Sequence, residues 1–298
     1  MNTDKDNQSI VLPESESRSL IIHGHGVCPY AKCSYCPLFS EDETKPFDLR
    51  EFEDHIRSEA RRFQLEDINS VFISEGNTIS LEPKTLNAIL KILYSHFPFL
   101  ETISAYGSAG AVLNRTPKQL ASFRRNGLSR IHMGLESGSD EVLQLLNKGV
   151  DTKGMLEAAT LIKNAGFELY LYVLIGAGGT ALSGEHVKAT AEAVNEISPG
   201  SVDFQTLVQI PNTPLTREAQ QERFSFLSPH ESIREIRDLI EEIETNVAIN
   251  CTHVSNHCHV RGIIPNERER LLQELDYSLS LDESLFANSG IANIELPN

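Results

Sequence analysis

Short runs of apolar and β-branched residues alternate along the sequence with longer segments of helical periodicity. The runs begin at intervals of roughly 30–50 residues, which is the length of one strand–helix unit. Because strands joined through helices require right-handed crossovers, this alternation predicts a parallel sheet covered by helices. The predicted strands cover residues 19–23, 70–74, 102–106, 130–135, 169–175 and 202–208, with a candidate seventh at 247–253.

Six or seven such units fit either a doubly wound sheet or a complete or partial β/α barrel. Both architectures place the active site at the carboxyl ends of the strands. A chain of 298 residues is long enough for two domains, but no linker rich in Pro, Gly or Ser interrupts residues 19–208. We therefore expect a flexible tail over 1–18, one catalytic domain over 19–228 and an extension packed on it over 229–298. The extension contains long helical patterns at 229–245 and 265–280.

The chain carries 26 Lys and Arg against 42 Asp and Glu, a formal net charge of −16. Nucleic-acid backbones are bound largely through Lys and Arg, so this balance argues against broad binding to nucleic acid. Residues 1–19 contain no apolar stretch long enough for a signal peptide, and no run approaches the ~20 apolar residues of a membrane-spanning helix. We therefore expect a cytoplasmic protein without a membrane anchor, in which thiols stay reduced.

Three of the 5 cysteines, Cys28, Cys33 and Cys36, follow the first predicted strand with the spacing Cys-x4-Cys-x2-Cys. In a reducing compartment such a cluster indicates a metal centre rather than disulfides. Three local thiolates can hold an iron–sulfur cluster and leave one iron open for a substrate or cofactor, which is a catalytic layout, and the spacing favours this interpretation. The alternatives are a closed cluster with a fourth ligand and a zinc site completed by His23, His25 or a distant cysteine.

Polar or glycine-containing segments follow the other predicted strands. Gly76 and Asn77 come after the strand at 70–74, and a glycine there lets the backbone approach a ligand closely, although an ordinary turn fits equally well. Glu136 follows the fourth predicted strand at its carboxyl end, inside the bowl of such a barrel, where a carboxylate can accept hydrogen bonds from ribose hydroxyls. Ser139 is a suitable helix N-cap, so the two residues have separate roles.

The fifth strand runs into Gly176-Ala177-Gly178-Gly179. A dinucleotide-binding fingerprint aligns with this segment. The alignment is weak, because the segment lies in the fifth unit and no acidic strand end follows about 20 residues further on.

These motifs together resemble those of the radical S-adenosylmethionine (radical SAM) superfamily. That family usually has Cys-x3-Cys-x2-Cys after the first barrel strand, with an aromatic residue just before the last cysteine, a position that Tyr35 occupies here. The present spacing has one additional residue between Cys28 and Cys33. The resemblance implies a partial (βα)6-type TIM barrel of parallel strands with a C-terminal α/β extension. It also implies that Cys28, Cys33 and Cys36 bind three irons of a 4Fe–4S cluster whose fourth iron is chelated by SAM.

The resemblance also implies a binding site for SAM. Gly76 and Asn77 fall where the family has a Gly-Gly-Glu-Pro-like segment that binds the methionyl amine, although only the glycine matches strictly. Glu136 lies in a Gly-x-Glu-Ser-Gly-Ser pattern, which is followed by Lys148-Gly149. The family's adenine-binding motif, Gly-x-Ile-x-Gly-x-x-Gly, is matched by the set Leu174, Gly176 and Gly179, with Tyr172 at its first glycine.

By this resemblance the protein cleaves SAM reductively, and the 5′-deoxyadenosyl radical abstracts a hydrogen atom from a small molecule or a protein side chain. A low-potential donor similar to flavodoxin or ferredoxin then supplies the electron. Two other functions compete with this one: a zinc- or cluster-stabilised binding module without catalysis, and a radical SAM enzyme that modifies transfer RNA. The net charge of −16 speaks against the last.

A second group of metal-ligating residues occurs near the C-terminus, within 251–259. Three interpretations compete: a second metal site, a histidine that acts as acid, base or substrate ligand, and ordinary packing. Similar proteins often have an Asn-His-Ala-like string here, which makes His257 the preferred catalytic residue. The group consists of Cys251, His253, His257, Cys258 and His259.

Overall fold

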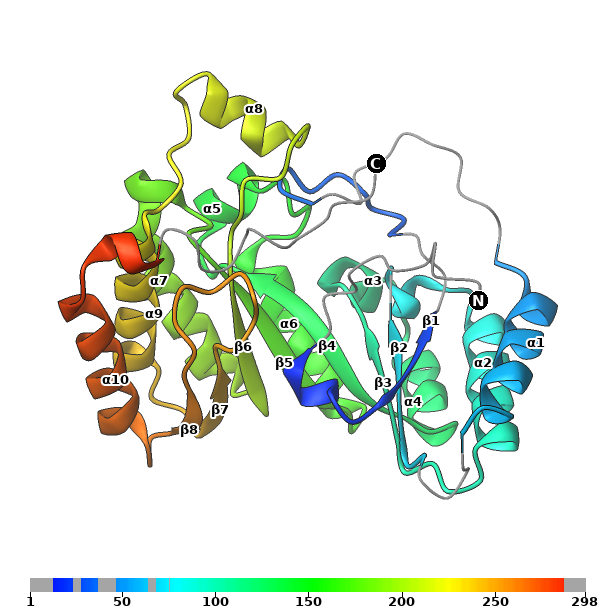
Figure 1. Cartoon of the computed structure of the whole chain (residues 1–298). Coiled ribbons are helices and arrows are strands. Elements are labelled where there is room, and N and C mark those ends of the chain that lie inside the picture. Colours follow the sequence, from blue (N-terminus) through cyan, green and yellow to red (C-terminus); the bar gives the residue numbers. More distant parts are fainter. Residues whose placement is uncertain (1–12, 24–27, 37–46, 64–67, 75, 287–298) are drawn as a thin grey trace, which may run out of the picture.

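The computed structural model describes residues 13–23, 28–36, 47–63, 68–74 and 76–286, and its eight strands form one sheet in sequence order. Seven strands are parallel, and the eighth pairs antiparallel with the seventh. β1 and β8 form the two edges, so the curved sheet is an open barrel (Figure 1). The strands are β1 (Leu20–His23), β2 (Ser70–Ser74), β3 (Thr102–Tyr106), β4 (Leu128–Glu136), β5 (Glu168–Ile175), β6 (Ser201–Thr206), β7 (Val247–Asn250) and β8 (Arg261–Ile264).

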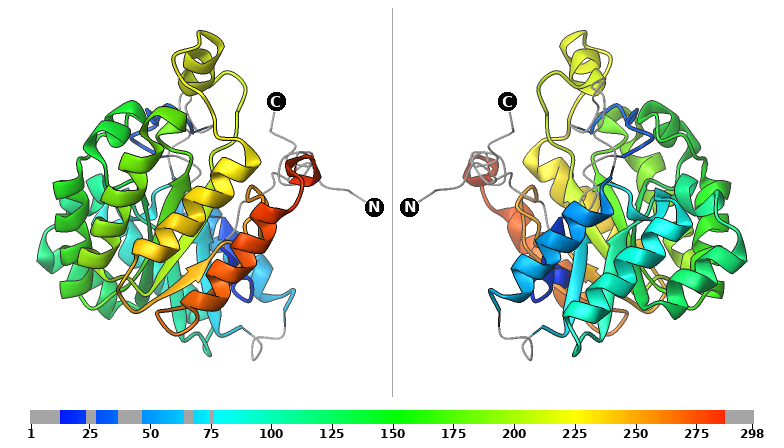
Figure 2. Two further views of the ribbon diagram at one scale, coloured as in Figure 1. Left: turned by 90° about the vertical axis from the view of Figure 1, so that its left-hand side faces the viewer. Right: turned by 90° about the vertical axis from the view of Figure 1, so that its right-hand side faces the viewer.

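The helices cover the outer face of this sheet (Figure 2). Together with the mostly parallel, unclosed sheet, they confirm the predicted α/β partial barrel. The α-helices are α1 (Leu49–Ala60), α2 (Pro83–His96), α3 (Ala109–Leu113), α4 (Pro117–Arg125), α5 (Asp140–Leu145), α6 (Thr152–Asn164), α7 (Gly179–Ile197), α8 (Pro214–Gln220), α9 (Pro229–Glu242) and α10 (Arg268–Ser280), and the 3-10 turns are η1 (Glu14–Glu16), η3 (Thr78–Ser80) and η4 (Glu283–Phe286). None of the described helices is long and apolar enough to cross a membrane.

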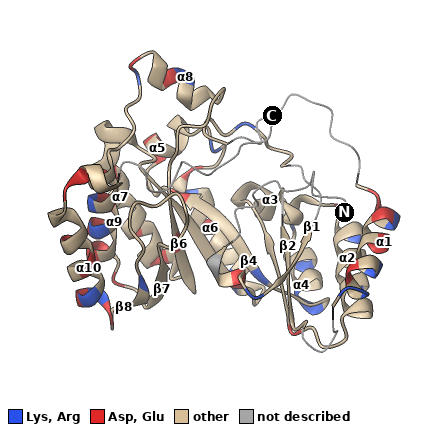
Figure 3. Ribbon diagram, viewed as in Figure 1, with Lys and Arg blue, Asp and Glu red and all other residues tan. Residues whose placement is uncertain are grey.

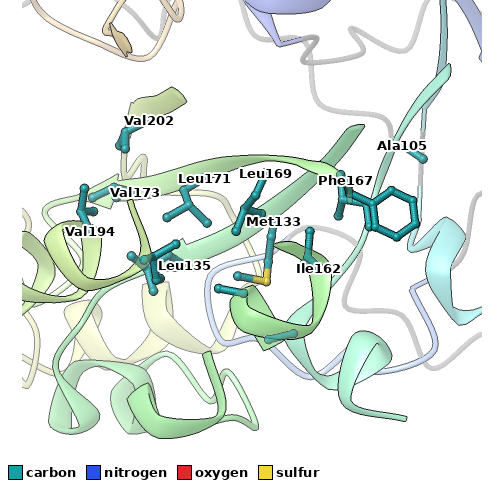
Figure 4. Packing of buried hydrophobic residues seen from close by; sticks show 14 of the residues in the cluster. Ala105, Met133, Leu135, Ile162, Phe167, Leu169, Leu171, Val173, Val194 and Val202 are labelled. Atoms are coloured by element: carbon teal, nitrogen blue, oxygen red, sulfur yellow. The ribbon is translucent and has the colours of Figure 1, made fainter. Parts of the chain in front are cut away.

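Alternation along the central strands separates an apolar outer face from a polar inner face. Figure 4 shows the outer face, where Met133 and Leu135 of β4 pack with Leu169, Leu171 and Val173 of β5 beneath the helices. Side chains one position along point the other way, into the bowl of the open barrel. Charged residues of both signs lie along the outer helices α1, α9 and α10 (Figure 3).

The strand predictions at 70–74 and 102–106 coincide with β2 and β3. The predictions at 202–208 and 247–253 extend beyond the ends of β6 and β7 by two and three residues, because those residues lie in loops at the mouth of the bowl. The edge strand β8 was not predicted. It has only four residues, including Arg261 and Gly262, so its local signal is weak and its pairing with β7 defines it.

The expectation of a tail over 1–18 is wrong for its described part. Residues 1–12 lie outside the described residues, but Glu16 at the end of η1 is 1% exposed and lies at the floor of the bowl. Its carboxylate accepts hydrogen bonds from Arg130 Nη1 at 2.9 Å, His132 Nε2 at 2.8 Å and Ser19 Oγ at 2.6 Å. Burial opposes the charge, but the bonds from His132, Ser19 and Arg130 outweigh it and lower the pKa of Glu16 to about 2.

The residues of the predicted extension continue the barrel. β7 and β8 prolong the same sheet, and α9 packs against both α7 and α10. The helical patterns expected at 229–245 and 265–280 correspond to α9 and α10.

Candidate active site

The cysteine loop is fastened to the C-terminal end of α5 and the N-terminal end of α8. Ser34 N donates to Leu146 O at 2.9 Å, and Ser34 Oγ donates to Leu145 O at 3.1 Å. Leu215 N in turn donates to Ser34 O at 2.9 Å. Loops usually run over the surface with few fixed contacts, so these bonds define where the three thiols are held.

A second set of bonds ties the same loop to the turn after α5. Asn147 Nδ2 donates to Lys32 O at 2.7 Å, and Tyr30 Oη donates to Asn147 O at 2.8 Å. Asn147 has φ 49°, a left-handed conformation that asparagine tolerates better than most residues. Gly149 lies beside the Tyr30 ring, where a Cβ would come within 2.5 Å of Cζ. The Lys148-Gly149 string is therefore needed partly for the close approach of the cysteine loop.

Tyr35, Glu136 and Lys148 meet inside the bowl beside the cysteine loop. Lys148 Nζ lies 2.7 Å from Glu136 Oε1, and Tyr35 Oη donates to the same oxygen at 2.9 Å. Glu136 has φ 62°, which is rare for a residue with a side chain and turns the carboxylate toward the lysine. At Gly134 a Cβ would lie 2.1 Å from Glu136 Oε1, so only glycine leaves room for this pair.

The protonation of this group follows from its burial and contacts. Burial raises the pKa of Tyr35 well above 10, and the neighbouring Glu136 charge raises it further, so Tyr35 stays a phenol that donates. Burial lowers the pKa of Lys148, but the Glu136 carboxylate outweighs this effect and the pKa rises above 10.5. Sequence reasoning identified Tyr35 and Glu136 separately. It left Lys148 without a role, because a Lys-Gly string alone does not show which carboxylate the lysine meets.

The cysteine trio has the chemistry that an iron–sulfur cluster needs. Burial raises the pKa of the Cys33 thiol to about 11, and among its neighbours Lys148 lowers that pKa while Cys36, Glu136 and Cys28 raise it. A bound cationic metal reverses this balance and deprotonates the thiols. Among the described residues no three His, Cys, Asp or Glu side chains are grouped to hold one metal ion. The three thiolates of a cluster each bind a different iron, so they need not converge on one point; His25, an alternative zinc ligand, lies outside the described residues.

The turn after β2 is held by Asn77. Gly76 has φ 58°, and Glu75 lies outside the described residues. Asn77 is buried, donates from Nδ2 to Ser108 Oγ at 2.6 Å and accepts from Ser108 N at 3.1 Å. Because Ser108 caps α3, this pair joins the carboxyl ends of β2 and β3. The Asn77 side chain thus fixes the turn at its described residues.

The turn after β5 needs glycine at two positions. Gly176 and Gly179 have φ 80° and 57°, and a Cβ at Gly179 would lie 2.7 Å from Ser225 O. Leu174 belongs to a small apolar cluster that Tyr35 packs against, so the turns after β1 and β5 approach each other. Tyr172 lies deeper in the bowl, with its Oη 3.3 Å from His132 Nδ1.

The C-terminal His and Cys group is divided between several contacts. Asn256 Oδ1 accepts from Thr206 Oγ1 at 2.9 Å, and Asn256 Nδ2 donates to Phe204 O at 2.8 Å, which fastens the β7–β8 loop to the end of β6. Cys251 and Cys258 are buried free thiols. His257 is half-buried and contacts the backbone of Phe286, while burial lowers the pKa of His253 to about 4. The predicted catalytic role of His257 stays a prediction.

The order of these sites along the sheet is the order of the sequence motifs, and each site lies at the carboxyl end of its strand. The model of the radical SAM superfamily matches residues 23–197, more than half of the chain. The chain belongs to this superfamily. Its members are enzymes that use a 4Fe–4S cluster and SAM, which confirms the cofactors expected for a chain of this family.

Solved structures share the fold of this radical SAM protein. Coproporphyrinogen III oxidase (HemN) from Escherichia coli has 17% identity and a TM-score of 0.56, with 75% of this chain and 51% of that chain covered. Elp3 from the archaeon Methanocaldococcus infernus has 16% identity and a TM-score of 0.57, with 77% and 60% covered. Methylornithine synthase (PylB) has 15% identity and a TM-score of 0.56, with 90% and 84% covered.

At these identities the similarity shows the fold alone. The chain spans 51% of the oxidase chain and 60% of an Elp3 chain that lacks its N-terminus (residues 1–46), so the activities of those proteins do not carry over to it. The search of curated proteins gives no match.

Proposed function

We propose that this protein cleaves SAM reductively and uses the product radical to abstract a hydrogen atom from a small molecule or a protein-borne side chain. The observation that carries the proposal is the contact of Tyr35, Glu136 and Lys148. It joins the cysteine loop to the end of β4 and places a carboxylate near the Cys33 thiol. A binding module stabilised only by a metal needs no such buried carboxylate in an open bowl.

The roles proposed for the metal ligands follow from the donor set. Cys28, Cys33 and Cys36 hold the 4Fe–4S cluster as thiolates. When bound, the cluster supplies one electron that divides SAM into methionine and a 5′-deoxyadenosyl radical, which takes a hydrogen atom from the substrate. Lys148 offsets part of the negative charge that the thiolates bring into the bowl.

The roles proposed for the SAM ligands follow from the ends of the strands. Glu136 accepts hydrogen bonds from the ribose hydroxyls, and Lys148 and Tyr35 keep its second oxygen aimed into the bowl. The backbone at Gly76 and Asn77 takes the methionyl amine. Adenine packs against the turn after β5, at the set Leu174, Gly176 and Gly179.

Aromatic side chains pack against one another in the lower bowl. The Phe72 and Tyr106 rings lie 5.0 Å apart edge to face, and the Tyr172 ring lies 6.0 Å from Tyr106. A radical formed above this floor is shielded from solvent from below. We propose a low-potential donor of the flavodoxin or ferredoxin type and a cytoplasmic location, where the thiols stay reduced; with a net charge of −16, a nucleic-acid substrate is disfavoured.

Anaerobic reconstitution with iron and sulfide tests the proposal. We expect a 4Fe–4S protein that forms 5′-deoxyadenosine from SAM in the presence of a strong one-electron reductant, and we expect Cys33→Ala to lose this activity. Cys251→Ala is the matched control, because Cys251 lies in the β7–β8 loop outside the proposed ligand set. Full cleavage activity in Cys33→Ala contradicts the assignment, and one zinc per chain without labile sulfide supports the binding module instead.

A further inference from the structure

A chain of buried polar side chains reaches the turns after β4 and β5 from outside the barrel. It begins at Glu235 of α9, whose Oε1 accepts from Gly176 N at 2.5 Å and whose Oε2 accepts from Ser183 Oγ. His186 Nε2 of α7 lies 3.5 Å from the same Oε1, a close polar contact without hydrogen-bond geometry. On its other side His186 Nδ1 lies 2.9 Å from Ser137 Oγ, in the residue next to Glu136.

Burial shifts the protonation of both titratable groups in this chain. It raises the pKa of Glu235 to about 7, against the opposing effect of the bonds that its two oxygens accept. Burial lowers the pKa of His186 to about 4, so the imidazole is neutral and carries one N–H. With that proton on Nε2 the ring faces the Glu235 carboxylate, and Nδ1 accepts from the Ser137 hydroxyl. Ser137 Oγ itself accepts from Ser139 N at 3.0 Å. The whole chain thus ends on the turn that carries Glu136.

The same turn is also held by threonines of α7 and α6. Gly138 N donates to Thr190 Oγ1 of α7 at 2.9 Å, and Gly138 O accepts from Thr152 Oγ1 of α6 at 2.6 Å. At Gly138 a Cβ would lie 2.1 Å from Ala189 O, so the turn touches the α7 backbone. Its position is therefore determined by α7, which Glu235 links to the turn after β5.

The order carboxylate, imidazole, hydroxyl also occurs in hydrolases, but the geometry here excludes that use. Ser137 and His186 are fully buried, and the Ser137 hydroxyl is engaged with backbone and ring. A groove of about 590 Å³ between α7 and α9 borders the Glu235 end of the chain, not the serine. A nucleophile needs access to its substrate, and this one has none.

We propose that Glu235 and His186 are positioning residues for SAM, which lock the β4 and β5 turns in the one arrangement that presents Glu136 and the Gly176 turn to the adenosyl group. This inference rests on the proposed function, because it takes those turns as the SAM site. Glu235 and His186 lie on the helical side of the turns and do not touch the ligand. Pre-formed turns reduce the ordering that SAM binding otherwise requires.

Two substitutions of Glu235 distinguish the loss of its hydrogen bonds from a general loss of packing. Glu235→Ala removes both acceptors, whereas Glu235→Gln keeps an oxygen for Gly176 N and gains an amide that donates to Ser183. In reconstituted protein we expect Glu235→Ala to raise the KM for SAM and the Kd for S-adenosylhomocysteine about tenfold, with kcat changed by less than threefold. Glu235→Gln stays within twofold of wild type. Asp238→Ala, one turn along α9 and lining the same groove, is the matched control and also stays within twofold.

Hydrogen exchange gives a readout that does not depend on turnover. The amides of residues 174–180 exchange faster in Glu235→Ala and at the wild-type rate in Glu235→Gln. Unchanged affinity together with unchanged exchange in the alanine variant overturns the proposal, and so do equal losses in both variants. If the alanine variant does not fold, Ser183→Ala removes one donor alone; it should weaken SAM binding two- to fourfold, and wild-type affinity there overturns the proposal.

The two proposals fail in different ways. Wild-type protein that binds S-adenosylhomocysteine but forms no 5′-deoxyadenosine contradicts the proposed function, while the affinity comparison still decides the positioning role. An active wild type whose Glu235→Ala variant is indistinguishable from it contradicts the positioning role alone. Wild-type protein that binds neither SAM nor S-adenosylhomocysteine overturns both.

Discussion

Glu16→Ala tests the finding that the segment before β1 closes the floor of the bowl. The pKa of the Glu16 carboxyl falls from 4.5 to about 2, because bonds from His132, Ser19 and Arg130 outweigh the opposing effect of burial. At about 1.4 kcal/mol per pKa unit, the charged carboxylate contributes roughly 3 kcal/mol to the free energy of unfolding at pH 7. Its removal also leaves the buried His132 and the largely buried Arg130 without this partner.

The matched control is Glu168→Ala. Glu168 also pairs with Arg130, at 2.8 Å, but its side chain is 59% exposed, so its loss should cost less than about 1 kcal/mol. Urea unfolding at pH 7 measures both. Because the pKa is depressed in the folded state, the wild-type advantage over Glu16→Ala is complete above about pH 4.5 and shrinks as the pH falls toward 2. Equal costs for the two variants at pH 7, or an advantage unchanged between pH 5 and 3, refutes this reasoning.

Three further predictions concern the turn after β5 and the charged group of the bowl. Gly179→Ala should lower the stability measured by thermal unfolding by about 1–3 kcal/mol, because residue 179 has φ 57° and the new Cβ would meet Ser225 O. The control is Gly184→Ala in the same helix. It has open space around it and should raise stability by up to about 1 kcal/mol. Lys148→Met should reduce 5′-deoxyadenosine formation at least tenfold and destabilise the fold by about 3 kcal/mol, because it leaves the Glu136 carboxylate without its cation; unchanged rates in the reconstituted variant contradict the assigned role. Tyr35→Phe removes one hydrogen bond of roughly 1.5–3 kcal/mol to that carboxylate and should raise the KM for SAM several-fold with little change in cluster content measured by iron and sulfide analysis.

The strands and helices follow from local periodicity wherever an element is long or capped. Pro83 opens α2, and Gly127 and Gly166 follow helices with φ of 104° and 83°, positions at which proline and glycine are local signals of a helix start and a helix end. Helical periodicity and helix-capping residues are both encoded within a few neighbouring residues. β8 lacks them, because a four-residue edge strand gains most of its stability from its partner β7.

The contacts of the bowl depend on residues far apart in sequence. Tyr35 and Glu136 each belong to a recognisable motif, but their hydrogen bond spans 101 positions and appears only when the barrel is formed. Glu16 carries no signal at all, because its neighbours are polar and its partner His132 lies 116 positions away. A polar segment can therefore be either a solvated tail or a buried, hydrogen-bonded segment, and the sequence alone does not distinguish the two.

The sequence predicts a boundary at residue 228, but side-chain hydrogen bonds cross this boundary. Across it Glu235 binds the backbone of Gly176, and Asn256 binds the backbone and hydroxyl at the end of β6. Removal of the later segment leaves Gly176 N and Phe204 O without these partners. It also exposes the side of α7 against which α9 packs and the edge of β6 that pairs with β7. The turn after β5, which we assign to SAM, therefore depends on a residue outside the span 23–197 that the superfamily model matches. The C-terminal segment thus supports the proposed SAM site through Glu235, and loss of the bond from Gly176 N to Glu235 should change SAM affinity as well as stability.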